Sequence, residues 1–296
     1  MTTALDIFTQ DQFRGNIGKL PTCQLLNSEA RPGLFVKEVE AKLAGWNETV
    51  GEYEKYTHQY RGADKKKEAG YFFAAPKMHI LGISPRLVEV TKKGTEKGLG
   101  KSGSILASYD SEVGQKYHYD ENNKGGTTLR TFYLIQLIDA KGNFIHDLPL
   151  TLSVHGVGAT AFGKAFTEFG KVAETAYTKL YSKAGEFLTL NEQAKASLIF
   201  NPKFMFDLRG EVEQSPVCVV ESFIEPSSKS QAELGKSFNM AKYERIIGTQ
   251  KSFASFADRV LKQLEEFHPT NGNLQLLGES QNMRSALPPS EVEVDF

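Results

Sequence analysis

The sequence predicts an α+β fold, with an OB-like small β-barrel or a curved antiparallel sheet at its centre and helices added around it. Short apolar runs rich in β-branched and aromatic residues, bounded by Gly, Pro, Asn or Asp, fill much of the chain up to residue 154 and are typical of strands. Two longer segments with apolar residues at every third or fourth position are typical of helices. Strands that mostly precede helices favour α+β.

Six segments carry the strand pattern. In chain order they are residues 71–80, 87–90, 104–109, 129–138, 144–154 and 217–224. Between the fourth and fifth segments lies Asp139-Ala-Lys-Gly-Asn143, in which Gly142 can adopt a positive φ. We therefore expect these two strands to form a hairpin.

Helical periodicity is clearest in residues 162–181 and 250–267. Gly156 and Gly158 are expected to permit a tight turn before the first helix, and Thr160 to cap it. Residues 92–103 hold four Gly and four Lys, with Leu99 as the only large apolar residue, and indicate an exposed flexible loop.

The domain organisation follows from length and composition. A chain of 296 residues with 40% hydrophobic side chains can bury a core without disulfides or metal. We expect a single globular α+β domain over residues 1–270 and a flexible acidic tail over residues 271–296. Periodicity is lost after residue 267, and Pro288-Pro289 breaks any helix there.

Cysteine usage and hydropathy indicate the cellular compartment. Cys23 and Cys218 are far apart and form no CxxC pair, which fits two buried thiols in a reducing cytoplasm. The first residues show no basic segment followed by an apolar one, and no run reaches the roughly 18 apolar residues of a membrane helix. A cytoplasmic protein without membrane contact is expected.

Catalytic patterns are incomplete. Residues 158–164 fit the phosphate-binding pattern GxxxxGK, but the next residue, Ala165, has no oxygen for Mg²⁺, and the strand ending at Glu221 is a weak match for a second nucleotide motif. The six histidines form no HxH or HExxH pair. We predict no catalytic residue, no metal site and no cofactor. Mg²⁺-dependent phosphate release would mark the alternative, a nucleotide-binding enzyme.

Charge is unevenly distributed although the net charge is −1. The early part of the chain is basic, and aromatic residues are interleaved with its cations. Single-stranded nucleic acid needs this mixture, because bases stack on aromatic rings while phosphates need positive charge. The alternative is a solvated turn beside core aromatics. The predicted nucleic-acid-binding residues are Tyr56, Tyr60, Arg61, Lys65, Lys66, Lys67, Lys77, Lys92, Lys93, Lys97, Lys116, Tyr117 and Arg130.

The tail ends in Ser290-Glu-Val-Glu-Val-Asp-Phe296, which resembles the C-terminal tip of bacterial and phage single-stranded DNA-binding proteins. The resemblance implies that the tip recruits DNA-processing proteins through Glu291, Glu293, Asp295 and Phe296. Acids steer the tip to basic partners, and the ring fills an apolar pocket. This sequence departs from the usual tip in having Val294-Asp295 before the Phe and fewer contiguous acids.

A second resemblance spans most of the chain. The pieces Leu20–Asn27, Gly33–Val36, Leu43–Trp46, Pro76–Ile80 and Arg130–Leu134 follow one another as in an uncharacterised bacterial family of unknown function that is frequent in cyanobacteria. The resemblance implies one fold for these pieces and assigns no activity.

Together these patterns favour a non-catalytic protein that binds single-stranded nucleic acid, in particular single-stranded DNA, with a partner-recruiting acidic tip. The alternative is a protein-interaction or structural component without nucleic-acid binding. Salt-dependent binding to oligonucleotides separates the two. A homo-oligomer is compatible with either.

Overall fold

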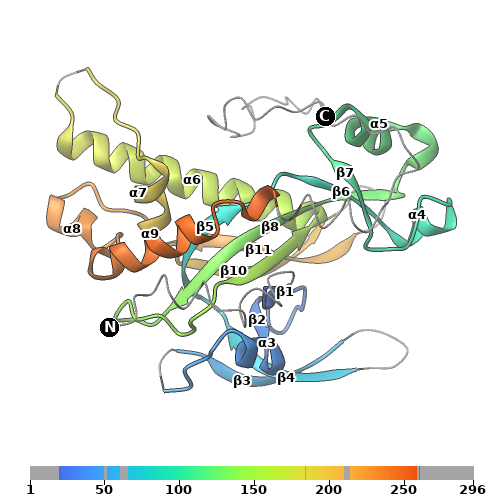
Figure 1. Cartoon of the computed structure of the whole chain (residues 1–296), viewed down its shortest axis with the longest axis horizontal. Helices are drawn as coiled ribbons and strands as arrows, with labels where there is room; N and C mark the ends of the chain where they lie inside the picture. The colour runs from blue at the N-terminus through green and yellow to red at the C-terminus, as the bar shows by residue number, and fades with distance from the viewer. Residues whose placement is uncertain are drawn as a thin grey trace.

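A mixed β-sheet of nine strands forms the centre of the computed structural model, which describes residues 20–49, 52–60, 66–183, 185–209, 214–258 and 260 (Figure 1). The strands are β1 (Thr22–Leu26), β2 (Gly33–Lys37), β3 (Glu54–Gln59), β4 (Lys67–Phe73), β5 (Lys77–Ile83), β6 (Leu87–Val90), β7 (Ile105–Ser108), β8 (Thr127–Ile138) and β9 (Leu150–His155). Their order is β3-β4-β2-β1-β9-β8-β6-β7, with β5 beside β8.

The sheet is not closed into a barrel, which corrects the OB-like expectation. The strands pair antiparallel except for β1 and β9, which run parallel. A parallel pair requires a crossover from distant parts of the chain and places β1 in the middle of the sheet. Among the described residues, β3, β7 and β5 each pair with a single strand, and the outer side of β5 meets Phe200 through an isolated bridge at Met78. The α+β class is confirmed, and the sheet is open and mixed.

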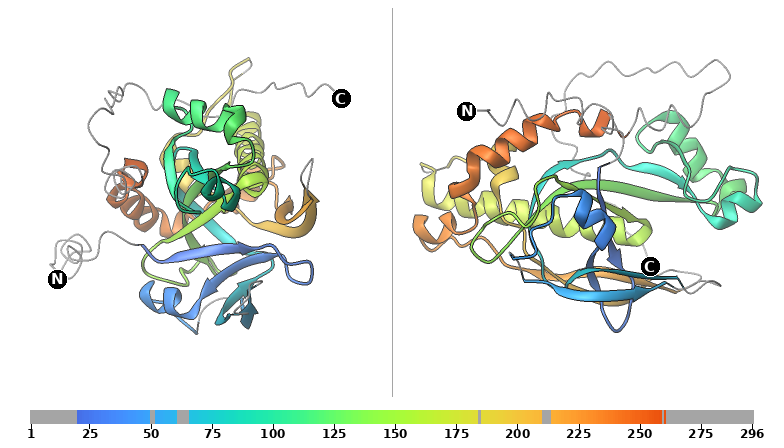
Figure 2. Two further views of the ribbon diagram at one scale, coloured as in Figure 1. Left: turned by 90° about the vertical axis from the view of Figure 1, so that its right-hand side faces the viewer. Right: turned by 60° about the horizontal axis from the view of Figure 1, so that its bottom comes forward.

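The helices are α3 (Glu38–Leu43), α4 (Lys92–Glu96), α5 (Glu112–Tyr119), α6 (Gly156–Tyr181), α7 (Glu192–Ser197), α8 (Gln231–Gly235) and α9 (Tyr243–Ser252), with 3₁₀ turns η1 (Glu121–Asn123) and η2 (Met240–Lys242). A separate antiparallel hairpin joins β10 (Pro202–Arg209) to β11 (Ser215–Phe223). Figure 2 shows β1–β4 at one end of the molecule and α4 and α5 at the other.

Both faces of β8 are covered. On one face the ring of Phe162 from α6 lies 4.8 Å from that of Tyr133, edge to face, within the largest apolar cluster. On the other face Leu134 packs with Ile246 of α9 and with Phe256. Alternate residues of a strand point to opposite faces, so one strand supplies both layers.

Several predicted boundaries change. The β8–β9 hairpin is confirmed, and Gly142 adopts φ 81°. The segment 71–80 divides into β4 and β5, because the chain turns at residues 74–76 and Pro76 has no N–H for a ladder. The strand predicted over 144–154 begins only at Leu150. Helix α9 covers Tyr243–Ser252, and residues 256–258 and 260 are helical again after a turn at 253–255, so within the described residues the helix predicted over 250–267 is interrupted.

The GxxxxGK motif lies inside a helix. Helix α6 begins at Gly156, which has φ 58°, and His155 is its N-cap, so Thr160 does not cap it. Gly158 packs against β11: a Cβ there would lie 3.3 Å from Cγ1 of Val217. Residues 158–164 therefore form no phosphate-cradling loop.

Residues 92–96 are helical, which corrects the predicted flexible loop. The Thr91 hydroxyl accepts a hydrogen bond from the Gly94 N–H at 3.1 Å and caps α4. Gly94 is buried, and a Cβ on it would lie 2.0 Å from the carbonyl oxygen of Gly126. The glycine thus serves close packing rather than mobility. Within the described ranges, no helix is both long and apolar enough to cross a membrane.

Candidate nucleic-acid interface

The predicted nucleic-acid-binding residues do not form one continuous track. Tyr56, Tyr60, Lys66 and Lys67 lie on or beside β3 and β4 at one edge of the sheet. The residues on α4, α5 and β8 lie toward the other edge, and they are Lys92, Lys93, Lys97, Lys116, Tyr117 and Arg130. Seven strand spacings separate the edges, roughly 34 Å across a flat sheet. Each group therefore needs its own test.

The edge strand β3 carries a row of aromatic rings. Tyr56, His58 and Tyr60 occupy alternate positions, so they share one face of the sheet, and each is half-buried. The ring centroids of Tyr56 and His58 are 6.1 Å apart, and those of His58 and Tyr60 are 4.5 Å apart. Phe35 and Phe72 lie beneath the row. We call these five residues the aromatic face.

Cations border the aromatic face. The Arg31 guanidinium lies 5.0 Å from the Tyr56 ring centroid, and the Lys37 ammonium lies 5.5 Å from that of Tyr60. Both make cation–π contacts. Arg31 also forms an ion pair with Glu54. The cations hold the rings from the side that faces the sheet interior.

Glu68 forms ion pairs with two lysines beside the aromatic face. Its two carboxylate oxygens lie 2.7 Å from Lys37 Nζ and 2.7 Å from Lys66 Nζ. Hydrogen bonds from these lysines lower the pKa of Glu68 to about 2. Burial and the neighbouring Glu68 raise the pKa of Tyr60 to about 12. The Tyr60 hydroxyl therefore stays protonated, and it also accepts a hydrogen bond from Gln24.

One polar atom of the aromatic face has no partner. The Nδ1 of His58 is buried and makes no hydrogen bond to the residues that the structure describes. Burial lowers the pKa of His58, so its ring is neutral near pH 7. A neutral ring can stack on a base as an aromatic residue does.

The opposite edge carries a second basic group of residues. Lys92, Lys93 and Lys116 are exposed and have no carboxylate within ion-pair distance among the described residues. Lys97 differs, because its Nζ donates to the carbonyl oxygens of Asn122 at 2.7 Å and Lys124 at 3.0 Å. Lys97 therefore ties the end of α4 to η1 and the residue after it, and its ammonium is not free for a phosphate.

Arg130 is engaged within the fold, and Lys77 lies apart from both groups. Arg130 lies 2.7 Å from the buried carboxylate of Glu89 and 3.3 Å from Nδ1 of His155, so its charge is neutralised within the fold. Lys77 begins β5 and pairs with Ile138, at the other end of β8 from Arg130. Arg61, Lys65 and the four tail residues Glu291, Glu293, Asp295 and Phe296 lie outside the described residues.

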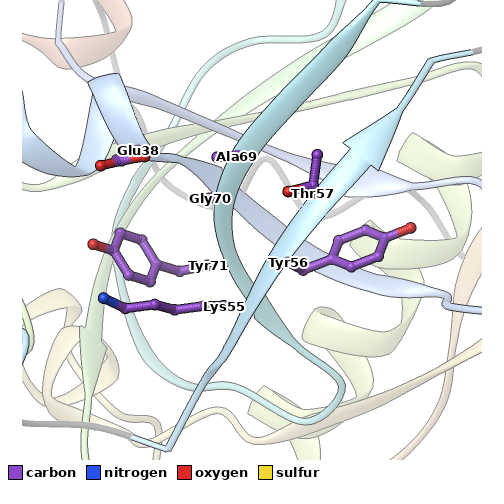
Figure 3. A pocket seen from close by; sticks show the side chains of 7 residues that line it. All are labelled: Glu38, Lys55, Tyr56, Thr57, Ala69, Gly70 and Tyr71. Atoms are coloured by element: carbon purple, nitrogen blue, oxygen red, sulfur yellow. The ribbon is translucent and has the colours of Figure 1, made fainter.

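The reverse side of the same strands is hollowed. A pocket of about 160 Å³ is lined by Lys55, Thr57, Tyr71 and Glu38 together with the backbone around Gly70, between α3 and the strands (Figure 3). Figure 3 shows Lys55 and Tyr71 on one side of the strands and Tyr56 on the other. A neighbouring hollow of about 400 Å³ lies where β2 turns into α3 and is lined by Lys37 and Lys42. Both are shallow surface features.

Sequence reasoning missed the partners that complete the aromatic face. Arg31, Lys37, Phe35 and Gln24 come from β1, β2 and the connection between them. Nothing local in the sequence links them to residues 56–60. The alternation of Tyr56, His58 and Tyr60 was a usable signal for a strand with one aromatic face.

Metal and thiol chemistry find no support at these surfaces. Across the described ranges no three His, Cys, Asp or Glu side chains gather as a metal site. Cys23 and Cys218 are buried free thiols, and burial raises the pKa of both. Inert thiols of this kind serve packing.

Comparison with known proteins gives one match. A model of a domain of unknown function, DUF5895, matches residues 18–266, which is most of the chain and nearly all of the described fold. Neither the curated proteins nor the solved structures contain a match. The matched region contains the aromatic face, the basic residues at the opposite edge and both cysteines, but not the acidic segment after residue 290. The chain belongs to the family of domains of unknown function DUF5895.

Proposed function

We propose that this protein binds single-stranded nucleic acid, in particular single-stranded DNA, on the aromatic face of β3. The observation that carries the proposal is the row formed by Tyr56, His58 and Tyr60, half-buried on one face of an edge strand and bordered by cations. Aromatic residues on an open sheet face bind unpaired bases by stacking.

The single strand is favoured over the duplex because the rings need unpaired bases. Stacking on an aromatic side chain contributes roughly 1–3 kcal/mol per base. A duplex hides the faces of its bases, so the same rings have nothing to stack on. The row lies along the strand direction, which suits a chain of successive bases.

Stacking, rather than charge, supplies most of the proposed affinity. Arg31, Lys37 and Lys66 already have carboxylate partners, and a phosphate must compete with them. Lys67 is exposed and has no ion pair among the described residues, but it lies opposite Gln59, on the other face of the sheet from the rings. We therefore expect few phosphate contacts, each contributing about 0.7 to the salt slope on single strands.

The test is fluorescence anisotropy with labelled single-stranded and duplex oligonucleotides over a salt series. Replacing Tyr56 and Tyr60 by Ala should weaken single-strand binding by about 2–6 kcal/mol, if two bases are stacked. Tyr181→Ala is the control, because it removes an exposed tyrosine of α6 that belongs to neither group of predicted binding residues. Equal affinity of the tyrosine variant and the unmodified protein would contradict the proposal.

The proposal includes recruitment of DNA-processing proteins by Glu291, Glu293, Asp295 and Phe296, which the acidic segment itself supports. Phe296→Ala keeps all three charges and removes the ring that would fill a partner's pocket. It should abolish capture of such proteins in a pull-down while oligonucleotide affinity stays unchanged. Identical partners with and without the ring would refute this part.

A further inference from the structure

We infer that residues 290–296 of this chain add as an extra strand to the open edge of β3. The inference concerns backbone groups and does not depend on nucleic-acid binding. Three observations carry it: the unprotected edge, the alternating pattern of the segment, and the length of chain that joins the two.

The outward backbone groups of β3 can be identified from one hydrogen bond. The N–H of Tyr60 donates to the carbonyl oxygen of Lys66 at 2.9 Å, so Tyr60 faces β4. In an antiparallel pair every second residue bonds to the same neighbour. Lys55, Thr57 and Gln59 must therefore direct their N–H and C=O groups away from β4. No described strand lies on that side.

The β3 edge has neither a proline, a bulge nor short length to protect it, and the charges it carries are those of Glu54 and Lys55. The pairing of β3 with β4 runs through six residue pairs without a shift in register. At the other edge, β7 has only four residues and its pairing with β6 contains a bulge. Prolines, bulges and short length protect edge strands from further pairing. The ladder of β5 with β8 also contains a register shift, and the outer side of β5 already meets Phe200. Of these three edges, that of β3 is the most regular and can accept a strand.

The segment Glu291-Val-Glu-Val-Asp-Phe296 has the period of a β-strand. When it is extended, Glu291, Glu293 and Asp295 lie on one side, and Val292, Val294 and Phe296 lie on the other. Such a strand beside β3 can place its apolar side chains next to Tyr56, His58 and Tyr60. Its acids then lie on the reverse face.

The reverse face offers matching charges. Lys55 lies on it, and Lys67 lies directly opposite Gln59, four residues further along β3. Four residues span about 13 Å in a strand, which is also the separation of Glu291 and Asp295. Lys55 already pairs with Glu48 at 2.8 Å on the surface, whereas Lys67 has no ion pair within the described part. In this arrangement the acids lie near Lys55, which also pairs with Glu48, and near Lys67, which has no other ion pair within the described part.

The chain is long enough to reach. Val260 packs in the cluster that contains Phe132 and Leu134 of β8, so the following chain starts there. β3 lies five strand spacings from β8, about 24 Å across a flat sheet. The 29 residues from 261 to 289 can span at most roughly 100 Å, about four times this distance, so the chain can bring residues 290–296 to β3.

The test is hydrogen exchange of backbone amides in the full chain without nucleic acid. We expect the outward amides of Lys55, Thr57 and Gln59 to be protected, and Val292→Pro with Val294→Pro to raise their exchange rates by roughly tenfold. Ser285→Pro with Ala286→Pro is the control, since it adds two prolines to the same tail outside the segment. Its exchange rates should equal those of the unmodified chain.

Two results would overturn the inference. Outward amides that exchange at the same rate in the Val292→Pro, Val294→Pro variant and in the unmodified chain would overturn the inference. Protection that grows with protein concentration would show docking onto a second copy and would overturn the intramolecular arrangement. Because no oligonucleotide is present, these results do not depend on whether the aromatic face binds nucleic acid.

Discussion

His79 and His146 are buried histidines whose protonation we expect to control stability in mild acid. They are 0% and 1% exposed. His79 donates from Nδ1 to the carbonyl oxygen of Leu198 at 2.9 Å, and its Nε2 accepts from the Asn239 side chain at 3.2 Å. Both ring nitrogens are occupied in the neutral form. A second proton would turn Nε2 into a donor that faces another donor.

His146 is held in the same way. Its Nε2 accepts from the N–H of Leu137 at 2.9 Å, and its Nδ1 donates to the carbonyl oxygen of Leu148 at 2.6 Å. Burial lowers the pKa of each histidine from 6.5 to about 4. The folded protein therefore binds these protons more weakly than the unfolded chain does.

The sign and size of the effect follow from this difference. Stability is fully present above pH 6.5 and is lost as the pH falls toward 4. One pKa unit corresponds to about 1.36 kcal/mol, so each histidine contributes about 3 kcal/mol that is absent at pH 4. If both titrate, the free energy of unfolding falls by up to about 2.7 kcal/mol per pH unit, against a total of typically 5–15 kcal/mol.

Urea unfolding between about pH 7.5 and pH 4.5 measures the effect. Trp46 is the single tryptophan and stacks on His146 at a centroid distance of 5.7 Å, so its fluorescence reports on this region. His146→Gln should reduce the slope to about 1.4 kcal/mol per pH unit. Loss of the Glu68 ion pairs comes later, as the pH falls from 4.5 toward 2. A stability that does not change from pH 6.5 to 4.5 would refute the reasoning.

Three further outcomes are expected. Asn239→Ala removes the donor to His79 and to the carbonyl of Gly142, 2.9 Å away, and should cost about 1–3 kcal/mol of unfolding free energy in a urea titration. Gly70→Ala should destabilise by about 1–3 kcal/mol or more, because the new Cβ would lie 2.3 Å from the carbonyl oxygen of Val36; an unchanged melting temperature would be inconsistent with this packing. We expect no ATP or GTP hydrolysis, since Gly158 and Lys164 lie within α6; turnover lost in Lys164→Ala would show otherwise.

The sequence was sufficient where local pattern decides the structure. The strand predicted over residues 87–90 is β6 without change, because an apolar run between a proline turn and a glycine-containing segment has few alternatives. The long helix was also predicted, although it begins at Gly156, six residues earlier. Its apolar positions recur with the helical period and are buried, as Phe162, Phe169 and Ala173 show.

Local sequence pattern did not predict the elements whose structure depends on contacts with distant residues. β3 has the sequence Glu-Lys-Tyr-Thr-His-Gln, which contains no apolar run and was not predicted as a strand. The alternation of its aromatic residues was the only local signal, and pairing with β4 completes the strand. β1 lies beside β9, about 130 residues away, and this parallel contact prevents an all-antiparallel barrel. Gly94 is a third case. A loop was predicted there from composition, whereas the close approach of Gly126 explains why the residue is glycine.

The candidate site was predicted only in part for the same reason. Tyr56, Tyr60 and Lys66 are neighbours in sequence and remain neighbours in the fold. Sequence reasoning also placed Lys97 and Arg130 among the binding residues, but their internal partners depend on the tertiary fold. A basic residue is available to a ligand only when the fold supplies no carboxylate or carbonyl for it.

The two proposals for β3 can be separated because side chains and backbone of one strand point in different directions. The rings of Tyr56 and Tyr60 project from one face, whereas the free N–H of Thr57 projects from the edge. Tyr56→Ala with Tyr60→Ala should weaken oligonucleotide binding and leave the N–H of Thr57 protected. Thr57→Pro removes the outward N–H without breaking a bond to β4, so it should abolish docking of residues 290–296 and leave the rings in place. If each variant impairs oligonucleotide binding and tail docking equally, β3 is disrupted in both variants. The assignment of binding to the rings and of docking to the edge is then refuted.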